Sequence, residues 1–386
     1  MALVLTLVAG LVGLTEVRLI GDALQRPEVA EFYTQPPGAA DGDPGTLIKS
    51  EQLWGDPVAS RAWRIMYRST DLNGDPVVVT GMVIVPLAPA PPGGRTVVSW
   101  GHPTVGSAAH CAPSRAFDPS FGIEGLRMLL DRGYAVVATD YAGMGTDGPD
   151  SYLIGVTEGN NVLDAVRAVQ RMPEVEASAD VILWGHSQGG QAVLFAAEDA
   201  ADYAPELKLR AVAVAAPAAD LSALLSAHLD DISGVTIGSY AFAAFADVYG
   251  PTVPGAELDA ILTPQAVALN AQLNELCLLT HLEELHRLGQ PLVGAFMLAD
   301  PTTTEPWATL LQQNSAGRRA FDAPLFVAQG LADELVVPAD TAAFVEHEAG
   351  LGIDVTSYTV PFADHGTIAY LAVPELDAWL DGHGLR

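Results

Sequence analysis

Residues 181–190 read VILWGHSQGG and contain an unbroken match to the pattern G-x-S-x-G, with Ser187 at its centre. The four apolar residues before the match are typical of a buried strand, and the following residues (QAVLFAAEDA) are typical of a helix. A strand–turn–helix segment of this kind strains the serine backbone, and neighbouring glycines let the strand and the helix approach closely. We therefore predict that Ser187 is a nucleophile. The alternative is an ordinary glycine-rich turn.

A serine hydroxyl needs a base that takes its proton. In chains with a nucleophilic serine in such a strand–turn–helix segment, called a nucleophile elbow, an acid and then a histidine follow the serine. Three histidines lie beyond the apolar run 324–328, namely His347, His365 and His383. We predict that His365 is the base, because it follows a predicted strand at 355–360 whose end would present it to the site. The other two are interpreted as surface histidines, since one lies in a helix-like stretch and the other almost at the C-terminus.

The acid is expected directly after the strand at 324–328, where residues 329–334 read QGLADE. We predict Asp333, whose role would be to hold the imidazole tautomer and to stabilise the imidazolium as it forms. Glu334 is the rival candidate. We discount Asp364, because it adjoins the predicted base in sequence and adjacent side chains usually diverge.

An oxyanion hole needs two backbone N–H donors that point at the developing negative charge. Gln188, the residue after the predicted nucleophile, offers the first. The second is expected from the loop at 101–106 (GHPTVG), in which Pro103 has no N–H, so we predict Thr104. His102 is interpreted as a packing residue beneath this loop.

Residues 143–148 read GMGTDG and match the dinucleotide-binding pattern G-x-G-x-x-G. In such a site the last glycine opens a helix that holds the pyrophosphate, but here Pro149 follows and the next helix-like pattern starts later. We interpret the segment as a loop and predict no cofactor. Nor does the sequence contain a Cys/His cluster with zinc spacing, and we predict no metal.

Apolar strands alternate with helices along most of the chain, which predicts a mostly parallel sheet covered by helices on both faces. Asn73-Gly74 predicts a two-residue hairpin turn between the first two strands. The predicted strands are 62–69, 77–85, 96–100, 134–139, 181–184, 211–215, 324–328 and 355–360, and the clearest helices are 125–132 and 160–172.

About a hundred residues rich in Ala and Leu separate the strand at 211–215 from the strand at 324–328. Helix-like patterns such as 220–228 and 264–287 favour a helical cap inserted into the sheet domain. The apolar stretches 241–245 and 295–298 could line an acyl site or simply form the core of the cap. We predict a core of residues 31–216 and 320–386, a cap of residues 217–319, and an N-terminal apolar segment of residues 1–30.

Residues 1–14 (MALVLTLVAGLVGL) have the length of a signal peptide and are too short for a membrane span. No positive charge precedes this run and no clear cleavage site follows it. A secretion signal is therefore weighed against a docked N-terminal strand or helix, or a mis-started reading frame.

Composition narrows the class of partner. Aspartate plus glutamate outnumber lysine plus arginine by 47 to 18, which gives a formal charge of −29. Such a surface repels nucleic acid and anionic membranes and favours small, neutral substrates. We expect a monomer that makes at most transient contact with lipid interfaces. The two cysteines, Cys111 and Cys277, permit one disulfide or two free thiols.

Beyond the elbow, the chain resembles the secretory lipase family, the lipase-A type of yeasts and many bacteria. The similar segments cover nearly all of the predicted core; they are EFYTQPP, GTLIKSE, RIMYRSTDLNGDPVVVTGMVIVP, WGHPTVG, HCAPS, GYAVVATDYAGMGTDG, WGHSQGGQA, QGLADELVVP and FADHG. The resemblance implies an α/β-hydrolase fold, export, a helical cap over an acyl tunnel, and hydrolysis of triacylglycerols and simpler carboxylic esters.

The family's catalytic pattern carries over onto Ser187, Asp333 and His365. Bacterial members pair the cysteine of the CAPS stretch with one in the cap, so the resemblance also implies a disulfide between Cys111 and Cys277. The oxyanion loop departs from the family, whose members usually read H-G-T where this sequence has proline at position 103.

These observations predict a serine ester hydrolase that acts through an acyl-enzyme intermediate. One alternative keeps the same triad but makes the protein a peptidase or an acyltransferase. The other is a catalytically silent lipid-binding protein, which is motivated by Pro103 in the oxyanion loop.

Overall fold

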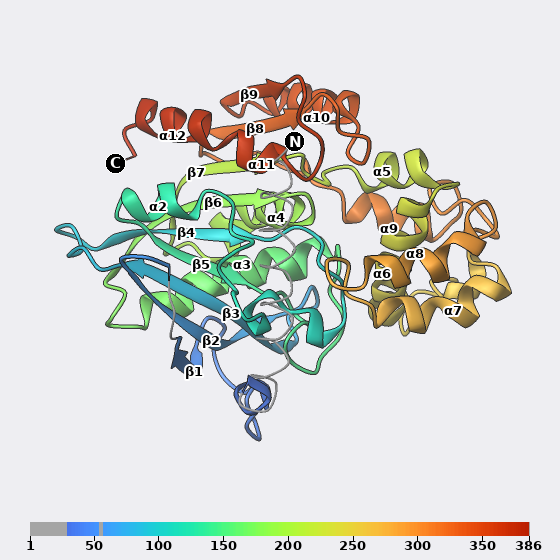
Figure 1. The fold of residues 1–386 in the computed structure, drawn as a ribbon, viewed down its shortest axis with the longest axis horizontal. Helices are drawn as coiled ribbons and strands as arrows, with labels where there is room; N and C mark the ends of the chain where they lie inside the picture. Colours follow the sequence, from blue (N-terminus) through green and yellow to red (C-terminus); the bar gives the residue numbers. More distant parts are fainter. Residues whose placement is uncertain (1–28, 54–56, 386) are drawn as a thin grey trace, which may run out of the picture.

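The computed structural model describes residues 29–53 and 57–385. The apolar run 1–14, on which the signal-peptide hypothesis rests, lies outside these residues. Within them, nine strands form one sheet in the order β1-β2-β3-β5-β4-β6-β7-β8-β9 (Figure 1). None of the helices in the described part of the chain is both long and apolar enough to span a membrane.

The sheet is antiparallel at one side and parallel in the rest. Its first three strands and β5 pair antiparallel, whereas β5, β4, β6, β7, β8 and β9 run parallel. The mostly parallel sheet predicted from the sequence is therefore confirmed. The strands are β1 (Leu47–Gln52), β2 (Ser60–Thr70), β3 (Pro76–Pro86), β4 (Arg95–Gly101), β5 (Ala135–Thr139), β6 (Ala177–His186), β7 (Lys208–Ala215), β8 (Leu325–Gly330) and β9 (Val355–Val360).

The hairpin between β2 and β3 differs from the predicted two-residue turn. Pairing stops at Thr70 and Pro76, which leaves a five-residue loop around the Asn73-Gly74 pair. The Asp71 carboxylate closes this loop by accepting hydrogen bonds from the backbone N–H groups of Asn73 (2.8 Å) and Asp75 (2.9 Å). A side chain that bonds its own loop favours this wider turn.

Helices cover both faces of the sheet. Side chains alternate along a strand, so Val97 of β4 packs with α3 and α4 on one face, while Val98 packs with α2, α11 and α12 on the other. The core helices are α2 (Leu126–Asp131), α3 (Gly155–Gln170), α4 (Gln188–Tyr203), α10 (Pro338–Gly350), α11 (Ile368–Leu371) and α12 (Val373–Gly382).

A helical insertion separates β7 from β8 and gathers at one end of the molecule, beyond the carboxyl ends of the central strands (Figure 1). Its apolar side chains, such as Phe242, join the cluster that covers one face of the sheet. We define this insertion as the cap; that it acts as a lid stays a prediction. Its helices are α5 (Leu221–His228), α6 (Ile232–Tyr249), α7 (Pro264–Asn274), α8 (Leu282–Gly289) and α9 (Trp307–Gln313).

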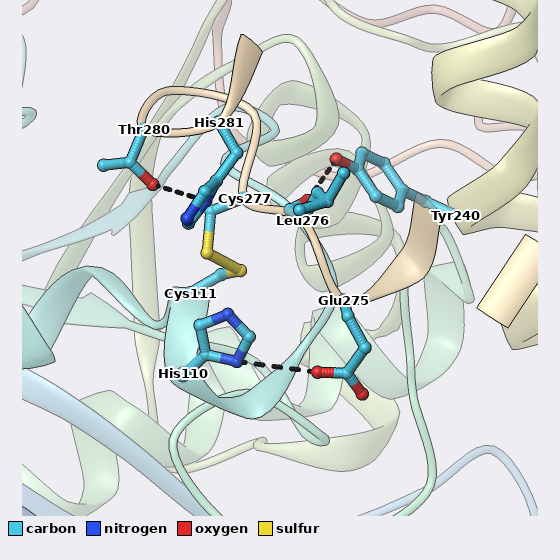
Figure 2. Close-up of a disulfide and its surroundings, with 8 residues drawn as sticks. All are labelled: His110, Cys111, Tyr240, Glu275, Leu276, Cys277, Thr280 and His281. Carbon is cyan, nitrogen blue, oxygen red and sulfur yellow. Dashed lines mark hydrogen bonds and ion pairs between the residues drawn. A yellow bond between two sulfur atoms is a disulfide. The ribbon is translucent and has the colours of Figure 1, made fainter. Parts of the chain in front are cut away.

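The helix-like pattern at 264–287 is two helices, because the segment between α7 and α8 bonds to the rest of the protein. Cys277 forms a disulfide with Cys111, as the resemblance implied. Beside it, the Leu278 N–H donates to the carbonyl of Val105 (2.9 Å), and the Tyr240 hydroxyl donates to the carbonyl of Leu276 (2.6 Å). Figure 2 shows the disulfide between Cys111 and the segment that contains Leu276 and Cys277. The cap is thus tied to the loop after β4.

Candidate active site

Ser187 lies in the turn between β6 and α4, and its backbone has φ 56° and ψ −117°, which side-chain-bearing residues rarely adopt. The turn is crowded. A Cβ atom added to Gly189 would lie 1.9 Å from the carbonyl oxygen of Gly101, and one added to Gly185 would lie 2.1 Å from that of Gly189. Only glycine fits at positions 185 and 189, as the motif predicted.

The three residues predicted as a triad meet at the carboxyl ends of β6, β8 and β9. The Nε2 atom of His365 lies 2.9 Å from Ser187 Oγ, and its Nδ1 atom lies 2.8 Å from Asp333 Oδ2. A carboxylate accepts only, so Nδ1–H donates to Asp333 and Nε2 is left to accept from the serine hydroxyl. This arrangement can remove the hydroxyl proton.

The Asp333 carboxylate is buried but well satisfied. Its Oδ1 atom accepts from the backbone N–H groups of Leu335 (2.8 Å) and Val336 (2.9 Å). Burial acts to raise the pKa of Asp333, but the hydrogen bonds from His365 and from these two N–H groups outweigh it and hold the pKa below its ordinary value. The group is therefore ionised at neutral pH.

The rival residues lie apart from this chain of hydrogen bonds. Glu334 is exposed, and Asp364 accepts from the hydroxyl of Thr367 (2.5 Å). The Nε2 atom of His347 donates to the carbonyl of Gly317, and the Nδ1 atom of His383 donates to that of Trp379, each at 2.8 Å.

Both predicted oxyanion donors border the serine. Gln188 is the first residue of α4, so its N–H is one of the donors that no carbonyl of the helix accepts. Thr104 lines the cavity at Ser187, and its Oγ1 lies 2.8 Å from the hydroxyl oxygen of Tyr152. His102 is buried beneath the loop, and its Nδ1 donates to the Pro103 carbonyl (2.7 Å).

The cavity at Ser187 is small and mostly apolar, with a free volume of about 10 Å³. It lies between the core and the cap. Phe242 and Phe296, from the apolar stretches considered as a lining, instead stack on each other with ring centroids 6.3 Å apart and are buried in the cap. The lining residues are Thr104, Tyr152, Leu153, Ser187, Gln188, Ala218, Leu224, Ile237, Leu335 and Val336.

Two buried carboxyl groups support the site and were missed in the sequence. Glu124 Oε1 lies 3.2 Å from Nδ1 of His186, whose Nε2 donates to the backbone carbonyl of His365 (2.9 Å). Glu158 Oε1 accepts from Nε2 of Gln188 (2.7 Å). The only available signal was that His186 and Gln188 flank the serine in the motif.

The glycine-rich segment 143–148 leads into a loop and not into a helix, since α3 begins only at Gly155. A Cβ atom added to Gly145 would lie 2.1 Å from Thr80 Oγ1, so the loop packs tightly against the sheet. The described residues contain one group of three potential metal ligands, His110 with Cys111 and Cys277, and both of these cysteines belong to the disulfide.

Known proteins similar to this chain are lipases and esterases. The family model of secretory lipases matches residues 121–383. A probable inactive lipase of Mycobacterium tuberculosis is 26% identical over 377 residues, which cover 92% of this chain and 81% of that protein. Lipase A of Moesziomyces aphidis is 24% identical over 378 residues, which cover 89% of this chain and 77% of that protein.

Solved structures agree on the fold. Candida antarctica lipase A in its closed state has a TM-score of 0.75 at 20% identity and covers 92% of this chain and 85% of that one. The rice cell wall degrading esterase LipA from Xanthomonas oryzae has a TM-score of 0.71 at 20% identity, with 88% and 98% covered. The predicted α/β-hydrolase fold is confirmed. Because the family model matches well over half of the chain, the protein belongs to the secretory lipase family of carboxylic ester hydrolases.

Proposed function

We propose that the protein cleaves carboxylic esters with Ser187 as nucleophile, His365 as general base and acid, and Asp333 as the residue that orients the imidazole. One observation carries the proposal. An unbroken chain of hydrogen bonds links the Asp333 carboxylate through His365 to the strained serine at the cavity. This chain supplies a base at the hydroxyl and a fixed negative charge behind the base.

The reaction follows from these positions. Ser187 Oγ attacks the ester carbonyl carbon while His365 Nε2 takes the hydroxyl proton. The N–H groups of Gln188 and Thr104 donate to the oxyanion of the tetrahedral intermediate. The imidazolium then gives its proton to the leaving alkoxide oxygen, and an acyl-serine and an alcohol result. Water, deprotonated by the same imidazole, attacks the acyl group, and the acid leaves as the serine recovers its proton.

The cavity favours esters of short, uncharged acyl groups. Its free volume of about 10 Å³ holds about one water molecule, so any acyl group must displace the lining, and short groups displace it least. Leu224, Ile237 and Val336 give it an apolar wall, and the formal charge of −29 disfavours anionic substrates. Longer acyl chains, including those of triacylglycerols, would require the cap to move away from the core.

We also propose that the protein works outside the cytoplasm. The family is secretory, and disulfides such as Cys111–Cys277 form and persist in oxidising compartments. Mass spectrometry of the culture supernatant and of the cells, with the mature N-terminus determined, tests this. Recovery of the protein only from the cytoplasm would contradict it.

The deciding experiment assays p-nitrophenyl esters of increasing acyl length with the wild type and with Ser187→Ala. We expect the variant to lose about 10³-fold or more in kcat, and short esters to be preferred. Ser226→Ala, at an exposed serine of the cap, is the matched control and should leave the rate unchanged. Equal rates for the wild type and Ser187→Ala would overturn the assignment.

Two further experiments distinguish the ester hydrolase from a peptidase and from a catalytically silent protein. Faster turnover of amides than of the corresponding esters would favour a peptidase. A serine-directed phosphonate that fails to label Ser187 would favour the catalytically silent protein, an outcome to consider because one relative is named a probable inactive lipase. Labelling of Ser187 together with ester turnover would exclude that alternative.

A further inference from the structure

The carboxyl group of Glu158, in the first turn of α3, is completely buried directly behind the site. Its Oε1 atom accepts two hydrogen bonds, from Nε2 of Gln188 (2.7 Å) and from the backbone N–H of Leu153 (3.1 Å). The titratable group that acts on it most directly is another carboxyl group, that of Asp150, whose own pKa burial raises to about 7. A carboxylate in this position would be a buried negative charge without a compensating cation, which is costly.

The same pair of side chains holds two unsatisfied atoms. Among the described residues, Glu158 Oε2 and Gln188 Oε1 are both buried and neither has a hydrogen-bond partner. A protonated carboxyl group differs from a carboxylate in having one O–H donor, and a primary amide has one oxygen acceptor. One proton on Oε2 would therefore satisfy both atoms and close a two-bond pair between acid and amide.

We propose that Glu158 is a protonated positioning residue, which clamps the Gln188 side chain through two hydrogen bonds and thereby fixes the backbone N–H that Gln188 presents to the oxyanion. This inference rests on the proposed function, because the oxyanion exists only if Ser187 attacks an ester. The clamp reaches the oxyanion loop as well, since the Leu153 N–H bonded to Glu158 adjoins Tyr152, whose hydroxyl oxygen lies 2.8 Å from Thr104 Oγ1.

The electrostatic surroundings agree with this protonation state. Burial raises the pKa of Glu158 well above its ordinary value, the hydrogen bonds from Gln188 and Leu153 lower it only in part, and Asp150 raises it further. Tyr141 and Tyr152 are the other titratable groups that interact with the carboxyl group, and burial raises the pKa of each, so both stay neutral. None of these groups supplies a positive charge to the carboxyl group.

Substitutions at Glu158 and Gln188 test the clamp. Glu158→Gln keeps a neutral group that can both accept and donate, so it should keep kcat within about twofold of the wild type. Glu158→Ala and Gln188→Met each remove one partner, and each should lower kcat about tenfold or more with little change in KM. The double variant should be no slower than either single variant, because one pair is lost in all three.

Glu348→Ala is the matched control, because Glu348 is also a fully buried glutamate but lies on α10. It should leave kcat unchanged, which separates loss of the clamp from the general effect of removing a buried carboxyl group. A folded Glu158→Gln variant as slow as Glu158→Ala would overturn the proposal, since the carboxylate charge would then be the active feature. Additive losses in the double variant would also overturn it.

Infrared spectroscopy tests the proton without any assay of activity. The spectrum of the wild type minus that of Glu158→Gln should contain the carbonyl band of a protonated carboxyl group at neutral pH, and absence of this band would overturn the proposal. Failure of the ester hydrolase assignment is recognised separately. The assignment of Ser187 as nucleophile fails if Ser187→Ala and the wild type hydrolyse esters at equal rates, whatever the infrared result.

Discussion

At the scale of single residues, the arrangement around His365 separates two neighbouring acids. Asp333 is buried and holds the Nδ1–H of the imidazole, whereas Glu334 is exposed. Asp333→Asn removes the negative charge and favours the wrong tautomer, so we expect kcat to fall by about 10⁴-fold with the fold intact. Glu334→Gln is the adjacent control and should change kcat little. Steady-state kinetics with a p-nitrophenyl ester measures both; a larger effect at Glu334 would reverse the assignment.

Pro103 gives a second prediction for a residue. Proline has no N–H, so in the proposed oxyanion hole the second donor is the N–H of Thr104, and a glycine at position 103 would add a donor without replacing that one. We expect Pro103→Gly to keep kcat within about threefold of the wild type, with the loss due to a more flexible loop. A large gain in kcat would instead mean that proline impairs this oxyanion hole. The comparison needs kcat at saturating ester.

The sequence predicts the proposed catalytic residues better than their supports. Ser187 sits in a local motif, and the chain order of the fold then points to Asp333 and His365. Glu124 and Glu158 lie 62 and 30 residues from the partners that they contact, His186 and Gln188. Such contacts depend on how α3 and the loop before α2 pack against β6, and no local pattern encodes that.

At the scale of elements, predictions succeed where periodic apolar patterns dominate. The central strands agree with their apolar runs, but α3 begins at Gly155, five residues before the predicted start at residue 160. The edge strand β1 was not predicted, because its only apolar residues, Leu47 and Ile48, are adjacent and do not alternate with polar ones, and three of its six residues are exposed. The break between α7 and α8 depends on the disulfide and on two hydrogen bonds to distant residues.

The disulfide provides a prediction at the same scale, because it joins the short helix η1 (Ala109–Cys111) to the cap across 166 residues of sequence. Closing so long a loop stabilises the folded state by about 5 kcal/mol in the chain-entropy model. The variant with serine at both positions should therefore unfold at a lower denaturant concentration. Its free energy of unfolding should be lower than that of the wild type by up to this amount. A reductant should destabilise the wild type but not this variant. Equal stability of the two proteins would contradict the expectation.

At the scale of the whole molecule, two groups of carboxyl side chains make stability depend on pH, and they respond differently to salt. The exposed carboxylates account for most of a formal charge of −29, and their mutual repulsion is screened by salt. Buried carboxyl side chains form the second group. Burial raises the pKa of Glu348 to about 7, with a further contribution from nearby Glu198, and both oxygens of Glu348 lack a hydrogen-bond partner among the described residues.

The sign of the effect on stability follows from linkage. The folded protein keeps the Glu348 proton up to pH about 7, whereas the unfolded chain releases it near the ordinary value of 4.5. The folded state therefore binds more protons between these values, and stability falls as the pH rises through this window, by about 3 kcal/mol in total. Asp333 acts in the opposite sense, since its lowered pKa stabilises the folded protein above about pH 4, and this contribution is lost as the pH falls further.

We therefore expect the free energy of unfolding to be highest in mildly acidic solution and to decline towards pH 8. Glu348→Gln carries no titrating group, so its stability should match that of the wild type near pH 4 and exceed it increasingly up to pH 7. Urea unfolding at pH 4 to 8, at low and at high salt, measures this. Salt should reduce the overall decline but leave the difference between the two proteins unchanged, because the carboxyl group is buried away from ions. A difference that is constant across this pH range would show that Glu348 is ionised in the folded protein, and the acid preference would then come from surface charge alone.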